Sequence, residues 1–159
     1  MSISILAVVD PDTSLVEART SHGELVTMDA DPPEGNGAGP GPKETLLMAL
    51  AGCTSMDVAS ILRKKRQSPE TYEIAVEGDA ADEHPRVFTA IRIEHRVRGE
   101  IDPEALRRSI ELSATRYCPV SAMLSAVATM EHWYRLTDAG GNQREALVAV
   151  TGPSGSRVL

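Results

Sequence analysis

A long, nearly uncharged segment limits the folds open to this chain. It reads PKETLLMALAGCTSMDVASIL over residues 42–62, and beyond Glu44 its one charged residue is Asp57. Proline is tolerated at the first helical position, and Glu44 lies in the first turn, where the helix dipole favours a negative charge. Apolar residues occur on nearly all sides, which is typical of a buried central helix. We therefore predict a core helix that ends at the cations of 63–66, because the Gly, Ser and Thr content disfavours a membrane span.

Shorter β-type patterns precede this helix. Residues 3–9 are β-branched and apolar, and the Asp-Pro at 10–11 ends them, so they predict a strand. Residues 14–28 predict a hairpin that turns near Gly23. Residues 29–41 hold three prolines and four glycines, which excludes a regular element and predicts a loop, either a linker or a lid.

The segments that follow the helix read as a hairpin, two helical stretches and a strand. Polar and apolar residues alternate over 72–76 and 86–98, which predicts an antiparallel hairpin with His95 as a hydrogen-bonded core histidine. Residues 102–118 open with an Asp-Pro helix start, 119–130 read as a further helix, and 131–136 read as a strand. This order indicates the α+β class, with one domain over residues 1–137. Residues 138–159 are predicted to be a C-terminal extension, with an extra strand at 144–150 before a loose tail.

Charge and composition exclude several classes of partner. The net charge of −7 over 159 residues repels phosphate backbones, so we expect no nucleic-acid partner. The N-terminus has no positively charged region before its short apolar run, so no signal peptide is predicted. We expect a cytoplasmic protein that does not associate with membranes.

The two cysteines, Cys53 and Cys118, are the main candidates for chemistry. They are separated by 118 − 53 = 65 residues, without Cys-x-x-Cys or His-x-x-x-His spacing, so we expect no metal site. Cys118 precedes Pro119, which predicts a position at the start of a helix; it is either a thiol activated by free N–H groups or a buried residue at a kink. Cys53 is either a core filler or a reactive thiol. Asp57, one turn away, would raise its pKa unless a cation pairs with it.

Gly52 lies directly before Cys53 and has two interpretations. A glycine there removes a side chain, which opens space for a partner thiol, another backbone or a substrate. It equally permits close packing of the helix against a neighbour. The sequence does not separate the two.

Two motifs together resemble the OsmC/Ohr family of stress-related proteins. They are GPKETLLMALAGCTSMDVASILRKKRQ and RYCPVSAML, and the resemblance covers about residues 20–136. It implies two long central helices packed between antiparallel sheets in an intertwined homodimer, with two thiols brought together near the dimer interface. In characterised members the first cysteine reduces an organic hydroperoxide and becomes a sulfenic acid, and the second condenses with it to a disulfide that an external dithiol reductant reopens. The resemblance thus implies a peroxidatic Cys53 and a resolving Cys118, with no other cofactor.

The chain departs from the family pattern at two points. Active members carry an acidic residue ten positions before the first cysteine, where this chain has Lys43, and Glu44 lies one step later. One residue turns a helical side chain by about 100°, so Glu44 is a weak substitute. The family's activating arginine comes from the N-terminal strands, where Arg19 is the candidate. Two hypotheses follow: a thiol-dependent hydroperoxide reductase of oxidative stress defence, or a non-catalytic dimer that responds to redox state or binds a small ligand.

Overall fold

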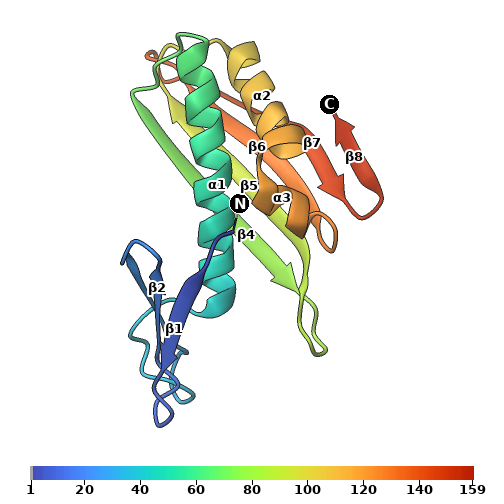
Figure 1. Ribbon diagram of the computed structural model, residues 1–159. Coiled ribbons are helices and arrows are strands. Elements are labelled where there is room, and N and C mark those ends of the chain that lie inside the picture. Colours follow the sequence, from blue (N-terminus) through green and yellow to red (C-terminus); the bar gives the residue numbers. More distant parts are fainter. Residues whose placement is uncertain (1) are drawn as a thin grey trace. The chain divides into compact units, whose positions relative to one another are not determined.

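The computed structural model describes residues 2–159, which form two compact units divided after Leu46 (Figure 1). The first unit contains an antiparallel sheet of β1 (Ile5–Val9), β2 (Val16–Thr20) and β3 (Leu25–Met28), in that order. The β2–β3 turn includes Gly23 with a φ of 96°, a left-handed backbone conformation that glycine adopts without strain. The predicted first strand and hairpin are confirmed.

The loop over 29–41 is irregular, as predicted, and is organised by one carboxylate. The Asp29 side chain is 3% exposed and accepts backbone N–H bonds from Ala30 at 2.8 Å, Ala38 at 3.0 Å and Asn36 at 3.1 Å. A Cβ at Gly35 would lie 2.3 Å from the Ala30 carbonyl oxygen, so no larger residue fits there. The loop therefore has a defined internal structure.

The predicted long helix is present as α1 (Pro42–Lys64). The Glu44 carboxylate accepts the backbone N–H of Gly41 at 2.8 Å and so satisfies a donor at the helix start. Burial is confined to one stripe, in contrast to the prediction of a helix buried on all sides. The stripe follows a four-residue repeat and consists of Leu50, Thr54, Val58 and Leu62, whereas Met48 and Met56 are 58% and 74% exposed. By length and composition α1 could also cross a membrane, a test that core helices pass as well.

The second unit is built on a sheet with the strand order β4-β5-β6-β7-β8. The strands are β4 (Thr71–Ala80), β5 (Phe88–Arg98), β6 (Thr129–Thr137), β7 (Gln143–Gly152) and β8 (Gly155–Val158). The predicted β4–β5 hairpin is confirmed. The prediction of purely antiparallel sheets is wrong, because β5 and β6 run parallel. A parallel pair needs a long crossover, which the helical segment between these two strands provides.

That crossover differs from the second long helix that the resemblance implies. It consists of α2 (Pro103–Leu112), a π-helical turn η1 (Ser113–Tyr117) and the short α3 (Pro119–Leu124). The helical prediction for 119–130 was too long, since β6 already begins at Thr129. The predicted extra strand lies within β7, but the predicted loose tail is wrong, because residues 155–158 pair with β7 as β8. The segment after residue 138 thus completes the sheet.

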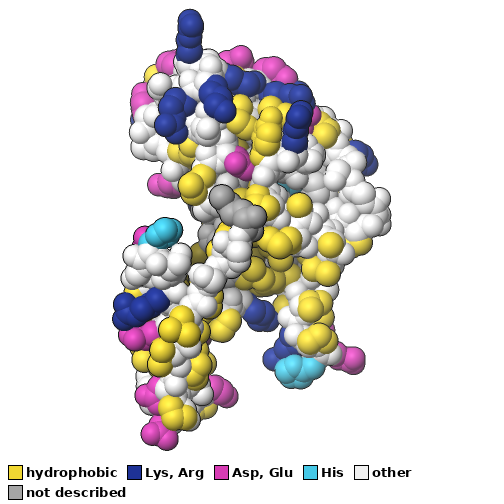
Figure 2. All heavy atoms as spheres, viewed as in Figure 1, with side chains coloured by type: hydrophobic (Ala, Val, Ile, Leu, Met, Phe, Trp, Pro, Cys, Tyr) yellow, Lys and Arg dark blue, Asp and Glu magenta, His cyan; other side chains and the backbone are white. Residues whose placement is uncertain are grey.

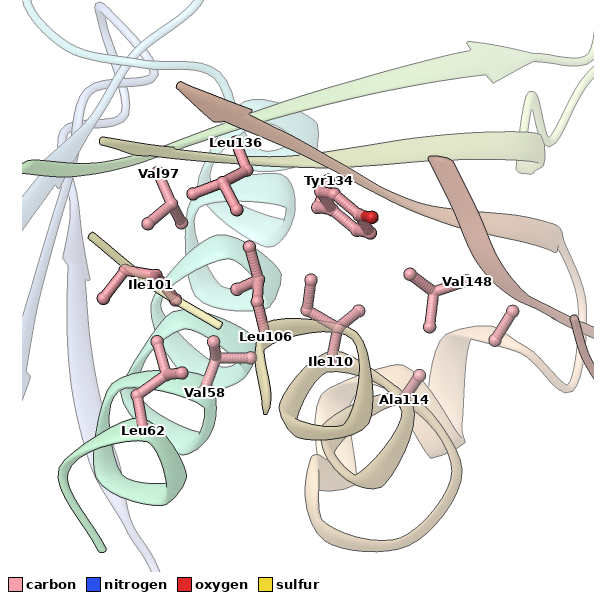
Figure 3. Close-up of a cluster of buried hydrophobic side chains, with 11 residues drawn as sticks. Val58, Leu62, Val97, Ile101, Leu106, Ile110, Ala114, Tyr134, Leu136 and Val148 are labelled. Carbon is pink, nitrogen blue, oxygen red and sulfur yellow. The ribbon is translucent and has the colours of Figure 1, made fainter. Parts of the chain in front are cut away.

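The core of this unit lies between the sheet and the helices, all of which cover the same face of the sheet (Figure 1). One cluster joins Val58 and Leu62 of α1 to Leu106 and Ile110 of α2 and to side chains of the sheet (Figure 3). A second cluster surrounds Leu50 and Cys118, and Cys53 packs against it. The buried His95 ring lies beneath the helices with its Nδ1 atom 2.6 Å from the Tyr72 hydroxyl, which confirms the predicted hydrogen-bonded core histidine.

Candidate redox site

The two cysteines meet although they are far apart in sequence. Cys53 lies in the middle of α1, and Cys118 lies between η1 and α3. Their sulfur atoms are 2.8 Å apart in the dithiol form. Cys118 is 3% exposed, whereas Cys53 is half-buried. The two thiols are therefore placed for direct reaction with one another, with Cys53 the more accessible of the two.

The position of Cys118 follows from its local sequence. Pro119 disfavours helical geometry in the residue before it, and Cys118 accordingly adopts an extended backbone with φ −74° and ψ 106°. As predicted, Cys118 is the N-cap of α3, and its sulfur accepts the backbone N–H of Ser121 at 3.3 Å. The backbone N–H of Val120 in the same turn acts to lower the pKa of Cys53. The first turn of α3 thus influences both thiols.

Two buried hydroxyl residues, Ser113 and Thr54, hold Asp57 in place one turn along α1 from Cys53. The Ser113 hydroxyl donates to the Asp57 carboxylate at 3.1 Å and lies 3.0 Å from the Thr54 hydroxyl. Ser113 and Thr54 are both fully buried. The sequence interpretation missed these two residues, although a small polar residue within an apolar helical stripe is a signal that could have identified them.

Ser113 is the first residue of the π-helical turn. The backbone N–H of Cys118 donates to the Ser113 carbonyl at 3.0 Å, a bond that spans five residues instead of four. Such turns occur often at functional sites. Here the turn places the Ser113 hydroxyl and the Cys118 sulfur beside the same stretch of α1.

The electrostatic environment works against ionisation of Cys53. Burial and the neighbouring Cys118 thiol raise the pKa of Cys53 to about 11, and the negative charge of Asp57 adds to that increase. The Val120 N–H acts in the opposite direction. Asp57 thus raises the pKa of Cys53, in the predicted direction. A thiolate at this position needs a further positive charge.

Space is available on both sides of the thiol pair. A Cβ at Gly52 would have no atom within 4 Å among the described residues, so close packing is not the reason for this glycine within the chain. A pocket of about 370 Å³ lies beside Cys118 and is lined by η1, the first residues of α3 and Ser156. The helix surface directly before Cys53 is thus open within the described chain.

The other predicted site residues belong to the N-terminal unit. Arg19 lies in β2, about half exposed, with a guanidinium nitrogen 3.9 Å from a carboxylate oxygen of Glu17. Glu44 is engaged in capping α1, and Lys43 lies beside it in the first turn. The roles of Arg19 and Glu44 in activating Cys53 stay predictions.

Cys53, Asp57 and Cys118 also form a cluster of groups that can bind metal ions. One ligand atom from each lies within 4.8 Å of the other two. Two of the residues share a face of α1, and the third comes from the helix junction. Sequence spacing alone could not show this cluster, because the fold and not a short motif brings its members together.

The mixed α+β fold with a thiol pair between a long helix and a helix junction defines a class of small dithiol proteins. The family model described as OsmC-like protein matches residues 35–132. The chain belongs to this family. Protein YhfA of Escherichia coli (strain K12) is 36% identical over 121 residues, which cover 76% of this chain and 88% of YhfA.

Solved structures share the fold at lower identity. An OsmC like protein from Mycoplasma pneumoniae superposes with a TM-score of 0.75 at 20% identity, over 86% of this chain and 97% of that one. The organic hydroperoxide resistance protein OhrB of Bacillus subtilis superposes with a TM-score of 0.59 at 13% identity, over 83% and 96% of the two chains.

Proposed function

We propose that this protein reduces organic hydroperoxides in the cytoplasm, as part of oxidative stress defence, with Cys53 as the peroxidatic and Cys118 as the resolving thiol. The observation that carries the proposal is the 2.8 Å separation of the two sulfur atoms. A sulfenic acid on one of them would have its trapping thiol already in contact. Membership of a family whose fold is shared by an organic hydroperoxide resistance protein supports the choice of substrate.

The proposed reaction has three steps. The Cys53 thiolate attacks the terminal peroxide oxygen of ROOH, which forms the Cys53 sulfenic acid and releases an alkoxide that takes up a proton to become ROH. The Cys118 thiol then attacks the sulfenic sulfur, which forms the disulfide and releases water. An external dithiol finally exchanges with the disulfide, which restores both thiols and leaves the oxidised reductant. Each cycle consumes one hydroperoxide and one dithiol.

We infer that Cys53 becomes activated when two chains assemble into a homodimer, which brings a positive charge to the thiol. All five residues of β1 are exposed, and α1 and α3 expose Met48, Met56 and Met123. Figure 2 shows hydrophobic side chains gathered in the middle of the viewed face, over the α3 region. Apolar surface of this kind in a small protein marks an interaction site. Arg19 is the residue proposed to supply the positive charge, with Glu44 as its acidic partner.

A second function is favoured by the electrostatics of the site. A Cys53 pKa of about 11 leaves little thiolate at neutral pH, and Lys43 replaces the acidic residue of active members. These two observations favour a non-catalytic dimer that responds slowly to redox state or binds a small ligand beside the thiols. The rate of reaction with hydroperoxide separates the two functions.

The experiment is a stoichiometric oxidation of the reduced protein with cumene hydroperoxide, followed by mass spectrometry of the cysteine peptides. The wild type is compared with Cys53→Ser and with Cys118→Ser, and dimedone is added to trap sulfenic acid. We expect a rapid Cys53–Cys118 disulfide in the wild type, dimedone-labelled Cys53 in Cys118→Ser, and no reaction in Cys53→Ser. A wild type that oxidises no faster than free glutathione would exclude the reductase and support the non-catalytic function.

A further inference from the structure

The thiol pair has a third member that the hydroperoxide cycle does not use. Asp57 is held at the site by a hydrogen bond from Ser113, and its carboxylate, together with the two sulfurs, forms a set of atoms within 4.8 Å of one another. A carboxylate beside a peroxidatic thiol is a hindrance, since its charge opposes the thiolate. The same carboxylate beside two thiolates is a favourable arrangement for a cation.

We propose that the reduced protein binds a thiophilic divalent metal ion of the Zn²⁺ type through Cys53, Cys118 and Asp57. Thiolates select such ions over Mg²⁺ or Ca²⁺, and zinc readily combines sulfur and carboxylate ligands in a tetrahedron. The three side chains leave the fourth position for water or a small ligand, as in zinc sites that are not closed. This inference is independent of the proposed reduction of hydroperoxides.

The geometry requires a small adjustment of the sulfurs. Two thiolates at about 2.3 Å from a tetrahedral zinc ion lie about 3.8 Å apart, compared with the 2.8 Å between the free thiols. Cys53 and Asp57 are separated by four residues on α1 and so extend from the same face of the helix. Cys53 is only half-buried, so its side chain has more freedom to adjust than the buried Cys118.

Binding exchanges two protons for one metal ion. Both thiols lose a proton, the metal ion forms two sulfur bonds and one oxygen bond, and two protons are released to solvent. The three ligands carry a charge of −3 when ionised, which the ion reduces to −1. No electron is transferred in this step. Oxidation of the thiols to a disulfide removes both sulfur ligands, so binding is restricted to the reduced protein.

A hydrogen-bonded support already surrounds the ligands. Ser113 orients the Asp57 carboxylate and is itself in contact with the Thr54 hydroxyl. The backbone N–H of Ser121 approaches the Cys118 sulfur. Such outer groups fix ligand orientation, and their loss typically lowers metal affinity about 10- to 100-fold.

The test is a titration of the reduced full-length protein with Co²⁺ as a spectroscopic substitute for Zn²⁺. We expect thiolate-to-cobalt charge-transfer absorption and intense visible bands of tetrahedral Co²⁺, saturating at one ion per chain and lost on addition of Zn²⁺. Asp57→Asn, which removes a ligand charge, is expected to weaken metal binding by about tenfold or more. Ser113→Ala, which removes only the support of that ligand, is expected to weaken it less than Asp57→Asn does. The exposed Asp79→Asn is the matched control and should bind like the wild type.

Two further measurements make the outcome decisive. Protein oxidised with diamide to the intramolecular disulfide should show neither band, and Cys118→Ser should lose part of the charge-transfer absorption. Circular dichroism of each variant establishes that it is folded. Absence of charge-transfer absorption in the reduced wild type would overturn the metal site. Equal affinities of the wild type and a folded Asp57→Asn would overturn the three-ligand site, and undiminished binding by the oxidised protein would place the metal elsewhere.

Discussion

Ser113 and Asp57 are joined by a 3.1 Å hydrogen bond that runs from a π-helical turn to the central helix α1. The bond keeps a carboxylate beside Cys53, where its negative charge contributes to the raised pKa of the thiol. The site therefore holds a pair of adjacent thiols together with a charge that opposes ionisation of Cys53.

Asp57→Asn should lower the pKa of Cys53 and accelerate its alkylation. The amide keeps the size of the carboxylate and removes the charge, so the thiolate loses a repulsive neighbour. We expect alkylation by iodoacetamide near neutral pH to become about tenfold faster at most, because burial and Cys118, the larger causes, stay in place. The pH profile of alkylation, read by peptide mass spectrometry, measures the change. An unchanged profile would show that the Asp57 charge is screened.

Arg19→Ala should slow the hydroperoxide-driven formation of the Cys53–Cys118 disulfide by about tenfold or more, if Arg19 supplies the activating charge. Arg19→Lys keeps the charge and should retain part of the rate. Arg144→Ala, at an exposed position of β7, is the matched control. The rate is followed by quenched mass spectrometry after mixing with cumene hydroperoxide. A wild-type rate in Arg19→Ala would assign the activating charge to another residue.

The stability of the fold should decrease below about pH 6.5 because of two buried histidines. Burial lowers the pKa of His95 to about 3 and that of His132 to about 4. Between these values and about 6.5 the unfolded chain binds protons that the folded chain does not, so stability is complete above this window and is lost as the pH falls through it. Each histidine contributes a slope of about 1.4 kcal/mol per pH unit.

Urea unfolding at several pH values tests this prediction. His95→Gln should reduce the slope of unfolding free energy against pH by about half, because one of the two histidines is removed. His22→Gln, at an exposed position in the β2–β3 turn, is the matched control. A wild-type stability that is constant from pH 7 to about 5 would contradict the assignment of buried neutral histidines.

Ile110→Ala should destabilise the fold by about 2–5 kcal/mol, since Ile110 of α2 is fully buried in the cluster shown in Figure 3 and its truncation leaves a cavity. Ile110→Val removes a single methyl group and should cost about 0.5–1.5 kcal/mol. Chemical denaturation under reducing conditions measures both. Similar costs for the two variants would indicate that the helix relaxes into the vacated space.

Local patterns allowed much of the fold to be predicted. The bounds of α1, the β4–β5 hairpin and the cap at Cys118 all follow from residues that are neighbours in sequence, such as Pro42 and Pro119. The parallel pairing of β5 with β6 could not be read in this way, because it depends on where the crossover returns the chain. Nor could β8, whose four residues are all exposed and carry no apolar alternation.

The sequence allowed the two cysteines of the candidate site to be predicted, but not the residues that support them. Cys118 was marked by the proline that follows it, and the family resemblance paired it with Cys53. Ser113 and Thr54 are two small hydroxyl residues, 59 positions apart, and Ser113 begins a π-helical turn that holds one residue more than a regular turn. A sequence pattern based on regular helices has no means of representing that insertion.

The two thiols that touch are separated by the whole β4–β5 hairpin and α2. A disulfide between Cys53 and Cys118 would therefore close a loop of 118 − 53 = 65 residues in the unfolded chain. In the chain-entropy description, closing a loop of that length raises the free energy of the denatured ensemble by about 4 kcal/mol. The oxidation state of one pair of sulfur atoms would then be readable in the melting temperature of the entire protein, as a rise on oxidation that a dithiol reverses.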